Sequence, residues 1–447
     1  MTNKIEFLTV EIGSTITKVN GFSLLPDGRF EHTAQGFAPT SIDRGDVRLG
    51  FNEAFSELKG KAGRLNPNAK TFVNSSAAGG LRMTVHGLTY SMTARAAREA
   101  ALGAGAIVKL VTAGLLEDDT LEEIKSINPN IILLAGGVDF GEKEIILKNA
   151  RAIAALGIHA PVVYAGNSAI HQYIQKIFQE HGVELLIAEN VFPEVDVLNT
   201  RPLRKVVHEV FNRHIIHAPG MQHLKEMTQG EIIPTPGAVL LGAELFAESC
   251  GDCLVFDVGG ATTDVHSVTN GSMEWTSRQV EPEPYAKRTV EGDLGVYINA
   301  RNIIELQEDK QWESMLPELK AIPCTTNEQT LTRFLCKMAV DVGIRRHAGI
   351  VMESYTPTGK KQTVRGKDLT AVKWVIGTGG ALTRIDGGFD ILRSVCLGAG
   401  KYLLPPPEAA ILLDRDYLFS ALGTLASTYP EQVKATFAHW VKMETMR

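Results

Sequence analysis

A chain of 447 residues is too long for a single ordinary hydrophobic core, so we expect two to four subdomains. An apolar content of 44% with 21% charged residues is typical of a folded globular protein and excludes a largely disordered one. The formal net charge of −6 disfavours a general nucleic-acid surface, and no apolar run of about 18 residues predicts a membrane span.

Cysteine usage and the N-terminus predict a cytoplasmic protein. The chain runs directly into a predicted strand without the apolar core of a signal peptide, and its five cysteines lack a disulfide-framework spacing. Cys250 and Cys253 form a CxxC pair, but no second pair completes a zinc site, so we interpret both as ordinary cysteines. His214 and His217 have helical spacing without supporting ligands, which favours a surface or packing role over metal binding.

The first predicted element, a buried strand at 7–10, leads into a glycine turn that the chain later repeats. Residues 10–19 (VEIGSTITKV) read apolar, acid, apolar, glycine, small or hydroxyl residues, a charge, and apolar again. Residues 256–265 (FDVGGATTDV) repeat this pattern 246 positions later, since 257 − 11 = 246. Turn signals follow both copies, Pro26-Asp27-Gly28 in one and Asn270-Gly271, a hairpin mark, in the other. Each half is therefore predicted to begin with a strand, a tight turn and a strand that doubles back.

The residue types in these turns suit phosphate binding. Glycine lets backbone N–H groups approach an anion, and successive N–H groups with nearby hydroxyls form a cradle. The flanking carboxylates suit a hydrated magnesium ion. Two such turns that face each other would hold a polyphosphate from both sides. The alternative, that each turn is only a glycine-containing hairpin, is disfavoured because the motif and its flanks both repeat. Lys18 either points at phosphate or is solvated at the strand end.

The rest of the first lobe, residues 1–104, is expected to contain a helix at 46–61 and a strand at 70–73. That strand leads into a loop of small residues at 74–81, which is either a third contact with the nucleotide or a place where subdomains pack closely. We favour packing, because alanine and glycine offer few chemical groups.

Residues 105–192 are predicted to form an inserted βαβ module. Strand-like runs alternate with segments of helical periodicity, and this alternation predicts a parallel sheet. Thr120 and Glu123 match a capping box at the first of these helices. The strand-like runs lie at 107–111, 131–135, 162–165 and 184–187, and two further helices are expected at 143–156 and 168–181. No G-x-G-x-x-G fingerprint follows any of these strands, so we interpret this segment mainly as an inserted module.

Residues 193–250 read as a helical connection, with a helix expected at 238–248 after a proline-rich break. Residues 251–447 read as a second lobe. Within it, 287–295 is dense in charge and glycine and is predicted to be a surface loop near the cleft, and 331–347 is predicted to be helical. Residues 374–382 (WVIGTGGAL) predict a strand, a glycine-rich turn and a helix start, whose backbone can lie against a base or ribose.

The order of two phosphate turns and a glycine-rich adenosine turn resembles the actin, sugar-kinase and Hsp70 ATPase superfamily. The whole chain is similar to one branch of it, the GlmL/MutL family of glutamate-mutase accessory proteins, which is unrelated to the mismatch-repair protein of the same name. The motifs that carry this resemblance are Glu11-Ile12-Gly13-Ser14-Thr15, the segment 75–81, Leu134-Ala135-Gly136-Gly137-Val138-Asp139, the segment 287–295, Arg345-Arg346-His347-Ala348-Gly349 and Asp414-Arg415-Asp416-Tyr417.

The resemblance implies an α/β protein with a two-lobed actin-like (ribonuclease H-like) ATPase fold and an inserted parallel α/β module. It also implies an ATP-dependent chaperone that reactivates an adenosylcobalamin-dependent mutase or aminomutase. Asp264 and His266 begin a cobalamin-binding D-x-H-x-x-G pattern, but Thr269 stands where that pattern needs glycine, so the cobalamin is expected on the partner. We expect ATP or ADP with magnesium as ligands, and no nucleic acid or membrane as a partner. The oligomeric state stays open.

The superfamily's roles carry over to the matching positions. Glu11, Asp257 and Asp264 would be catalytic, and the two aspartates would orient magnesium through water. The phosphates and adenosine would be bound by Gly13, Ser14, Thr15, Lys18, Gly259, Gly260, Ala261, Thr262, Gly377, Thr378, Gly379 and Gly380.

Glu11 departs from the superfamily pattern, which has aspartate at the first-loop acid. The extra methylene moves the carboxylate outward by about one bond length, enough to disturb the positioning of a metal or water. Nucleotide binding tolerates this change more easily than rapid hydrolysis does, so the sequence predicts a slow ATPase. The alternatives are a nucleotide-binding remnant without turnover, a small-molecule kinase on the same fold and a nucleotide-dependent assembly protein.

Overall fold

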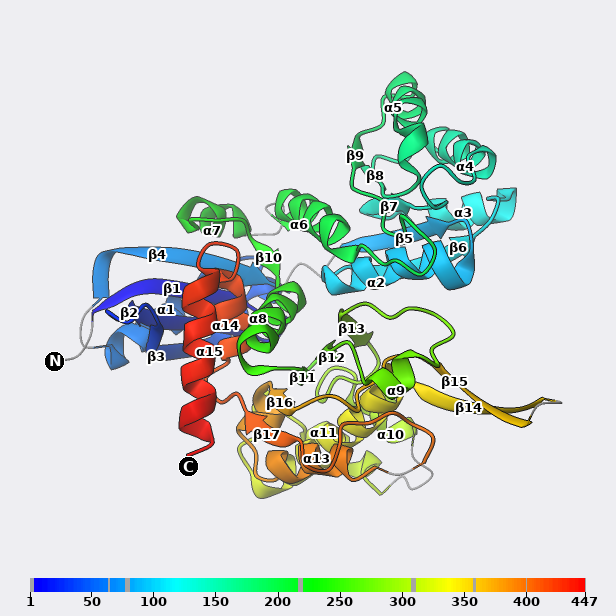
Figure 1. Cartoon of the computed structure of the whole chain (residues 1–447). Coiled ribbons are helices and arrows are strands. Elements are labelled where there is room, and N and C mark those ends of the chain that lie inside the picture. Colours follow the sequence, from blue (N-terminus) through cyan, green and yellow to red (C-terminus); the bar gives the residue numbers. More distant parts are fainter. Residues whose placement is uncertain are drawn as a thin grey trace. The chain divides into compact units, whose positions relative to one another are not determined.

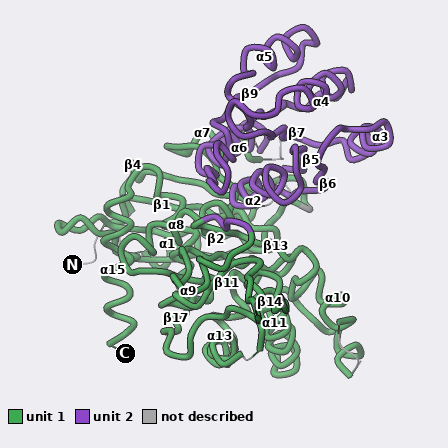
Figure 2. Tube along the Cα trace, turned by 45° about the vertical axis from the view of Figure 1, so that its right-hand side comes forward, with its two compact units in different colours: residues 1–78, 216–280, 285–447 green, residues 79–215, 281–284 purple. Residues whose placement is uncertain are grey.

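The structure is a computed structural model that describes residues 4–62, 65–76, 81–215, 220–306, 311–356, 359–398 and 400–446. The chain forms two compact units, which Figure 2 shows in green and purple. The first contains residues 1–78, 216–280 and 285–447, and the second contains 79–215 with 281–284. The second unit is thus broader than the module expected at 105–192. The finer division of the chain into four parts stays a prediction.

The first unit begins with a five-stranded sheet in the order β10-β4-β1-β2-β3. Its strands β1, β2 and β3 are antiparallel neighbours, whereas β4 is parallel to both β1 and β10. The turn at 26–28 closes the hairpin between β2 and β3, with Gly28 at a φ of 84°. The strands are β1 (Ile5–Ile12), β2 (Ile16–Leu24), β3 (Phe30–Pro39), β4 (Leu65–Ser75) and β10 (Ile233–Pro234), and helix α1 (Arg48–Lys61) follows β3 (Figure 1).

A second five-stranded sheet in the same unit repeats this topology. Its order is β13-β12-β11-β16-β17, with the first three strands antiparallel and β16 parallel to both β11 and β17. The register repeats as well, because Glu11 pairs with Lys18 in one sheet and Asp257 pairs with Asp264 in the other. The strands are β11 (Cys253–Val258), β12 (Thr263–Val268), β13 (Ala286–Glu291), β16 (Trp374–Thr378) and β17 (Ala410–Leu413). This duplicated sheet is the two-lobed, ribonuclease H-like arrangement of actin-like proteins, so the predicted fold class is confirmed.

One hydrophobic core joins the two sheets through α8 (Thr235–Cys250), α14 (Leu418–Leu425) and α15 (Pro430–Glu444). The rings of Phe246, Phe419 and Phe437 lie 4.9–5.5 Å apart at its centre. Phe72 of the first sheet and Val255 of the second belong to the same cluster. Each buried phenylalanine contributes about 1.5–3 kcal/mol. The core therefore fixes the first turn of α14 against both lobes.

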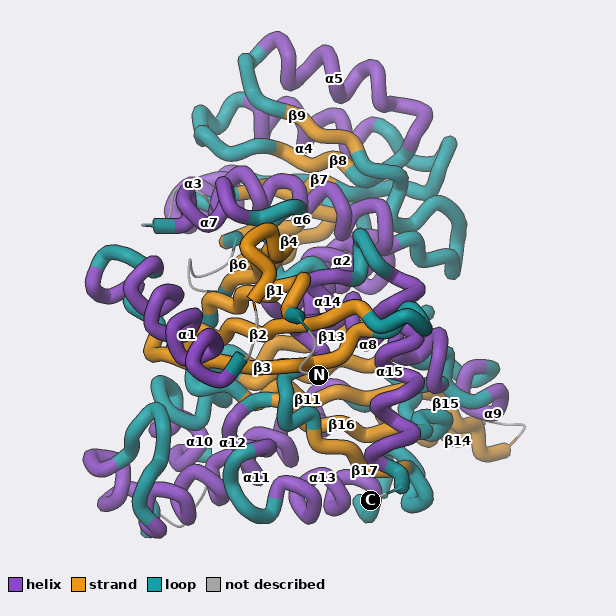
Figure 3. The backbone as a smooth tube through the Cα atoms, turned by 90° about the vertical axis from the view of Figure 1, so that its left-hand side faces the viewer, coloured by secondary structure: helices purple, strands orange, loops and turns teal. Residues whose placement is uncertain are grey.

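A second core lies under the other face of the second sheet. Its main helix, α11 (Thr326–His347), starts with a capping box between Thr325 and Glu328. Around it lie α10 (Ala300–Glu305), α12 (Gly380–Thr383) and α13 (Gly388–Cys396), while α7 (Met221–Met227), α9 (Met273–Thr276) and the hairpin of β14 (Ile350–Thr356) and β15 (Gly359–Arg365) complete the unit (Figure 3).

The second unit is a parallel α/β layer, as the sequence predicts. Its sheet has the order β6-β5-β7-β8-β9 with every neighbouring pair parallel. Strand β5, which lies between β6 and β7, was not among the predicted strands. The elements are β5 (Arg82–Gly87), α2 (Arg95–Gly103), β6 (Ile107–Ala113), α3 (Asp118–Ile127), β7 (Ile131–Leu134), α4 (Glu144–Ala154), β8 (Val162–Tyr164), α5 (His171–Glu180), β9 (Leu185–Ile187) and α6 (Thr200–Ile215).

Three local predictions are wrong. The segment 287–295, expected to be a surface loop, is largely strand β13. Lys287 and Arg288 of this strand are buried because they lie between packed elements of the second lobe. Asn270-Gly271 does not close a hairpin, since α9 follows it and β13 begins only at Ala286. The capping box at Thr120 is absent because α3 already starts at Asp118, with two aspartates in its first turn favouring the helix dipole.

Candidate phosphate site between the two glycine turns

The two glycine turns have the same backbone geometry. In the first, the N–H of Gly13 donates to the carbonyl of Ile16 at 3.1 Å, and in the second the N–H of Gly259 donates to the carbonyl of Thr262 at 2.9 Å. A side chain at Gly13 would clash with that carbonyl, since its Cβ would lie 2.5 Å away. The shared hydrogen bond therefore explains why glycine recurs at the first position of each turn.

Both turns face each other within the first unit. A Cβ built on Gly260 would lie 3.3 Å from the Cγ2 of Thr15, so the tip of the second turn is in contact distance of the first. Thr40 supports the first turn, because its hydroxyl donates to the carbonyl of Gly13 at 2.8 Å. Asn299 supports the second by donating to the carbonyl of Ala261 at 2.7 Å. Ser14 is exposed at the tip of the first turn.

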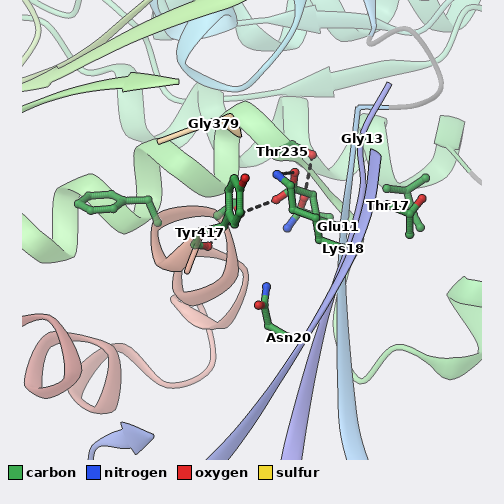
Figure 4. A network of polar contacts seen from close by, with 12 residues as sticks. Glu11, Gly13, Thr17, Lys18, Asn20, Thr235, Gly379 and Tyr417 are labelled. Carbon is green, nitrogen blue, oxygen red and sulfur yellow. Dashed lines mark hydrogen bonds and ion pairs between the residues drawn. The ribbon is translucent and has the colours of Figure 1, made fainter. Parts of the chain in front are cut away.

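Glu11 and Lys18 form an ion pair beside these turns, with Lys18 Nζ 2.6 Å from Glu11 Oε1. The other oxygen of Glu11 accepts a hydrogen bond from the hydroxyl of Ser420 at 2.5 Å. The ammonium group of Lys18 also lies 4.1 Å from the ring centre of Tyr417 (Figure 4). Burial opposes the charge on Lys18, but Glu11, Tyr417 and Asp257 outweigh it and raise the pKa of the lysine well above its usual value. Both oxygens of Glu11 are thus engaged within the protein.

Asp257 interacts electrostatically with this pair, and Asp414 interacts in turn with Asp257. Burial raises the pKa of Asp257 to about 7, with Lys18 opposing the shift and the neighbouring acids adding to it. Burial likewise raises the pKa of Asp414 to about 6, although the N–H groups of Phe419 and Leu418 oppose it. Glu11 and Asp414 both add to the raised pKa of Asp257, so negative charge is concentrated around this carboxylate. A carboxylate in such a setting has the chemistry of a magnesium ligand, but no group of three such side chains among the described residues has the arrangement of a metal site.

Asp264 stands apart from that group of acids. Its carboxylate forms a buried ion pair with Arg288 at 2.7 Å, and both side chains are almost completely enclosed. Burial raises the pKa of Asp264, while Arg288 opposes the shift. Because Arg288 already neutralises this carboxylate, Asp257 is the better placed of the two predicted magnesium residues. The metal role of Asp264 stays a prediction.

The predicted adenosine turn follows β16 with its glycines in different settings. Gly377 lies inside the strand, where an added Cβ would be 2.8 Å from the side chain of Leu392, so this glycine serves close packing. Gly379 has a φ of 88° and lies against the carbonyl of Val258, at the end of β11. Thr378 is buried beside it, and Gly380 is exposed at the start of α12. The exposed backbone of Gly380 is thus the part of this turn that is open to a ligand.

Sequence reasoning overlooked the segment 414–420 as part of this site. Asp414 accepts hydrogen bonds from the N–H groups of Leu418 and Phe419, and this caps α14. That helix start then places Tyr417 over Lys18 and Ser420 against Glu11. An aspartate before the apolar helical run 418–425 was a usable signal for the cap, but nothing local linked it to Glu11.

Some predicted features lie outside the described residues, namely 77–80 of the small-residue loop and His217. Among the residues that are described, no group of three histidine, cysteine or acidic side chains has the arrangement of a metal site. In the same residues, every helix is too short or too polar to cross a membrane. All five cysteines are free.

The duplicated sheet and the paired glycine turns define the class, a two-lobed actin-like protein. A family model described as "MutL protein" matches residues 7–441. "Protein MutL" of Clostridium tetanomorphum is 37% identical over 452 residues, covering 95% of this chain and 97% of that protein. The chain therefore belongs to the MutL family.

Solved structures are similar over most of the chain but at low identity. Acetone carboxylase in a nucleotide-free structure is 12% identical, with a TM-score of 0.42 over 94% of this chain and 70% of that one. The diol dehydratase-reactivating factor in nucleotide-free form is also 12% identical, with a TM-score of 0.36 over 95% of this chain and 100% of that one. Likenesses at these TM-scores identify neither an activity nor a partner.

Proposed function

We propose that this protein is an ATP-binding molecular chaperone that reactivates an adenosylcobalamin-dependent mutase or aminomutase. Two findings support the proposal. The chain belongs to the MutL family, and its resemblance to the GlmL/MutL accessory proteins implies a role with such mutases. The single observation that carries ATP binding is the approach of Gly260 to Thr15, since it brings the two phosphate-type turns to one site.

In this proposal the backbone N–H groups of the two turns hold the terminal phosphates. Gly13, Ser14 and Thr15 act from one side, and residues 259–262 act from the other. Asp257 holds magnesium through water, and the turn at 377–380 lies against adenosine. Cleavage of the phosphoanhydride bond of bound Mg-ATP converts the protein from its ATP-bound state to its ADP-bound state. Closure of the lobes then changes the protein surface that binds the mutase. For the nucleotide to control this interaction, the mutase must bind the open and closed forms with different affinities.

Slow hydrolysis is expected from the contacts of Glu11. Lys18 and Ser420 occupy its two carboxylate oxygens, so the side chain is held away from the role of positioning water.

The test is a thermal-shift titration with Mg-ATP and Mg-ADP, followed by co-purification with a cobalamin mutase. Saturating nucleotide, at about 100 times the dissociation constant, should stabilise the fold by about 2.7 kcal/mol. Gly260→Val should abolish this shift, because a larger side chain would push against Thr15 and Tyr297. Gly292→Val is the matched control, since no atom lies within 4 Å of an added Cβ at that position. A wild-type melting temperature that neither Mg-ATP nor Mg-ADP changes would contradict the proposal.

The kinase and assembly alternatives share the same phosphate turns, but the bound nucleotide has a different fate in each of them. Formation of a phosphorylated metabolite in a substrate screen would favour a small-molecule kinase. Light scattering that rises with ATP would favour an assembly protein.

A further inference from the structure

One edge of the second unit presents a strongly exposed aromatic side chain. Phe140 lies in the loop after β7 and is 80% exposed. Its φ of 63° falls in the left-handed region, which a bulky side chain rarely adopts. Asp196, in the neighbouring segment, has a φ of 62°. Such conformations persist only where the surrounding structure enforces them, and they are concentrated at functional sites.

A network of buried polar side chains enforces this arrangement. The buried Asn167 accepts a hydrogen bond from the N–H of Phe140 at 3.0 Å, and its amide group donates to the carbonyls of Gly141 and Glu142. The buried Asn190 donates to the carboxylate of Asp139 at 3.0 Å. These polar groups bond to one another and to the backbone. The edge therefore offers a rigid apolar side chain instead of an open polar pocket.

The neighbouring segment extends the same surface. The N–H of Asp139 donates to the carbonyl of Pro193 at 2.9 Å, which ties the Phe140 loop to residues 189–197. Val195 and Val197 in that segment are 63% and 43% exposed. In the segments 139–144 and 189–197 four acidic side chains are exposed against one exposed lysine, Lys143; the acids are Glu144, Glu189, Glu194 and Asp196. An apolar tip thus lies within an acidic surround.

We propose that Phe140, Val195 and Val197 form a docking surface for the partner mutase, whose matching surface has an apolar socket with a rim of lysine and arginine. This inference rests on the proposed function and assigns the mutase contact to particular residues. Charge complementarity favours a basic rim, and the acidic surround disfavours an anionic membrane. A rigid aromatic residue that enters a socket is typical of the residues that dominate binding at protein interfaces.

Phe140→Gly tests the surface without damaging the fold, because glycine adopts the observed φ of 63° freely. We expect an unchanged or higher melting temperature, an unchanged Mg-ATP shift and a loss of mutase affinity of about 30-fold. The binding partners are purified adenosylcobalamin-dependent mutases and aminomutases, titrated one at a time by calorimetry. Tyr355→Ala is the matched control, since this aromatic residue is 84% exposed in the first unit and should leave mutase affinity unchanged.

Glu194→Lys tests the charge of the same surface. We expect weaker mutase binding and a smaller effect of added salt, because one attractive charge has become repulsive. Glu123→Lys, an exposed position on α3, is the control. Wild-type affinity in both Phe140→Gly and Glu194→Lys would overturn the docking surface and leave the chaperone proposal standing. Failure of the wild-type protein to bind any mutase would overturn both, and binding to anionic vesicles through Phe140 would overturn the choice of a protein partner.

Discussion

At the scale of single residues, the contacts of Glu11 connect the sequence departure to a physical cause. An aspartate at this position would be one methylene shorter and would lose its reach to Ser420, Lys18 or both. Glu11→Asp should therefore free a carboxylate for water and raise single-turnover ATP hydrolysis by roughly 10-fold. Glu11→Gln is the control, because it keeps the length, lacks the charge and should stay slow. Slower hydrolysis in Glu11→Asp would contradict this account.

Buried neutral histidines predict a loss of stability in mild acid. His86 lies inside β5, where its ring is hydrogen-bonded to Thr84 and Thr112, and burial lowers its pKa to about 3. The unfolded chain takes up a proton near pH 6.5 and the folded one does not, so stability falls as pH drops below 6.5. At pH 5 the loss from this residue is about 2 kcal/mol. His208, whose burial lowers its pKa to about 4, adds in the same direction.

Urea unfolding followed at pH 7 and pH 5 with a probe in the second unit measures this loss. The His86→Gln protein should be less stable than the wild type at both pH values, and its free energy of unfolding should depend less steeply on pH. Asp257 contributes with the opposite sign, because its raised pKa makes the folded first unit take up a proton first as pH falls below 7. An unchanged pH slope in His86→Gln would show that this histidine is not the source.

At the scale of elements, the close approach of α8 and α14 positions the Ser420 contact. A Cβ on Gly423 would lie 1.8 Å from the carbonyl of Ala238, and one on Gly242 would lie 2.5 Å from the carbonyl of Phe419. Gly423→Ala should therefore cost about 1–3 kcal/mol of unfolding free energy through overpacking. Since Ser420 lies on the same helix, the variant should also weaken the hold on Glu11.

Gly60→Ala in α1 is the matched control, because no atom lies within 4 Å of an added Cβ and alanine favours the helix. It should stabilise the protein by about 0.5–1 kcal/mol, so the two glycine substitutions have opposite signs. Equal urea midpoints for both variants would rule out tight α8–α14 packing.

At the scale of the whole molecule, the chain joins its two units at more than one place. Residues 281–284 belong to the second unit, although they are covalently continuous with β12 and β13 of the second sheet. Within the second unit, Arg95 forms ion pairs with both Glu281 and Glu283. Arg95 thus holds the segment that directly precedes β13 in the chain.

Arg95→Ala should lower the stability of the second unit by about 1–3 kcal/mol, because the enclosed Glu283 loses its ion-pair partner Arg95. It should also reduce the effect of ATP on mutase affinity while leaving the Mg-ATP thermal shift intact. Arg98→Ala is the control, since it also removes the ion-pair partner of an enclosed carboxylate, Glu99, but leaves the contacts of Arg95 with 281–284 in place. Calorimetry of mutase binding with and without Mg-ATP would show the difference, and an undiminished ATP effect in Arg95→Ala would argue against coupling through this segment.

The sequence by itself determined the features that depend on neighbours along the chain. The duplicated glycine turns, the doubled-back strands and the alternation of strand and helix in the second unit all arise from local patterns of apolar residues and glycine. Only the tertiary structure decided which polar and charged side chains meet. Ser420 is 409 residues from Glu11 in the chain, and Arg288 lies on a strand that was predicted to be a loop. Periodicity reports which face of an element is buried, whereas partners in a buried ion pair are chosen by packing between distant elements.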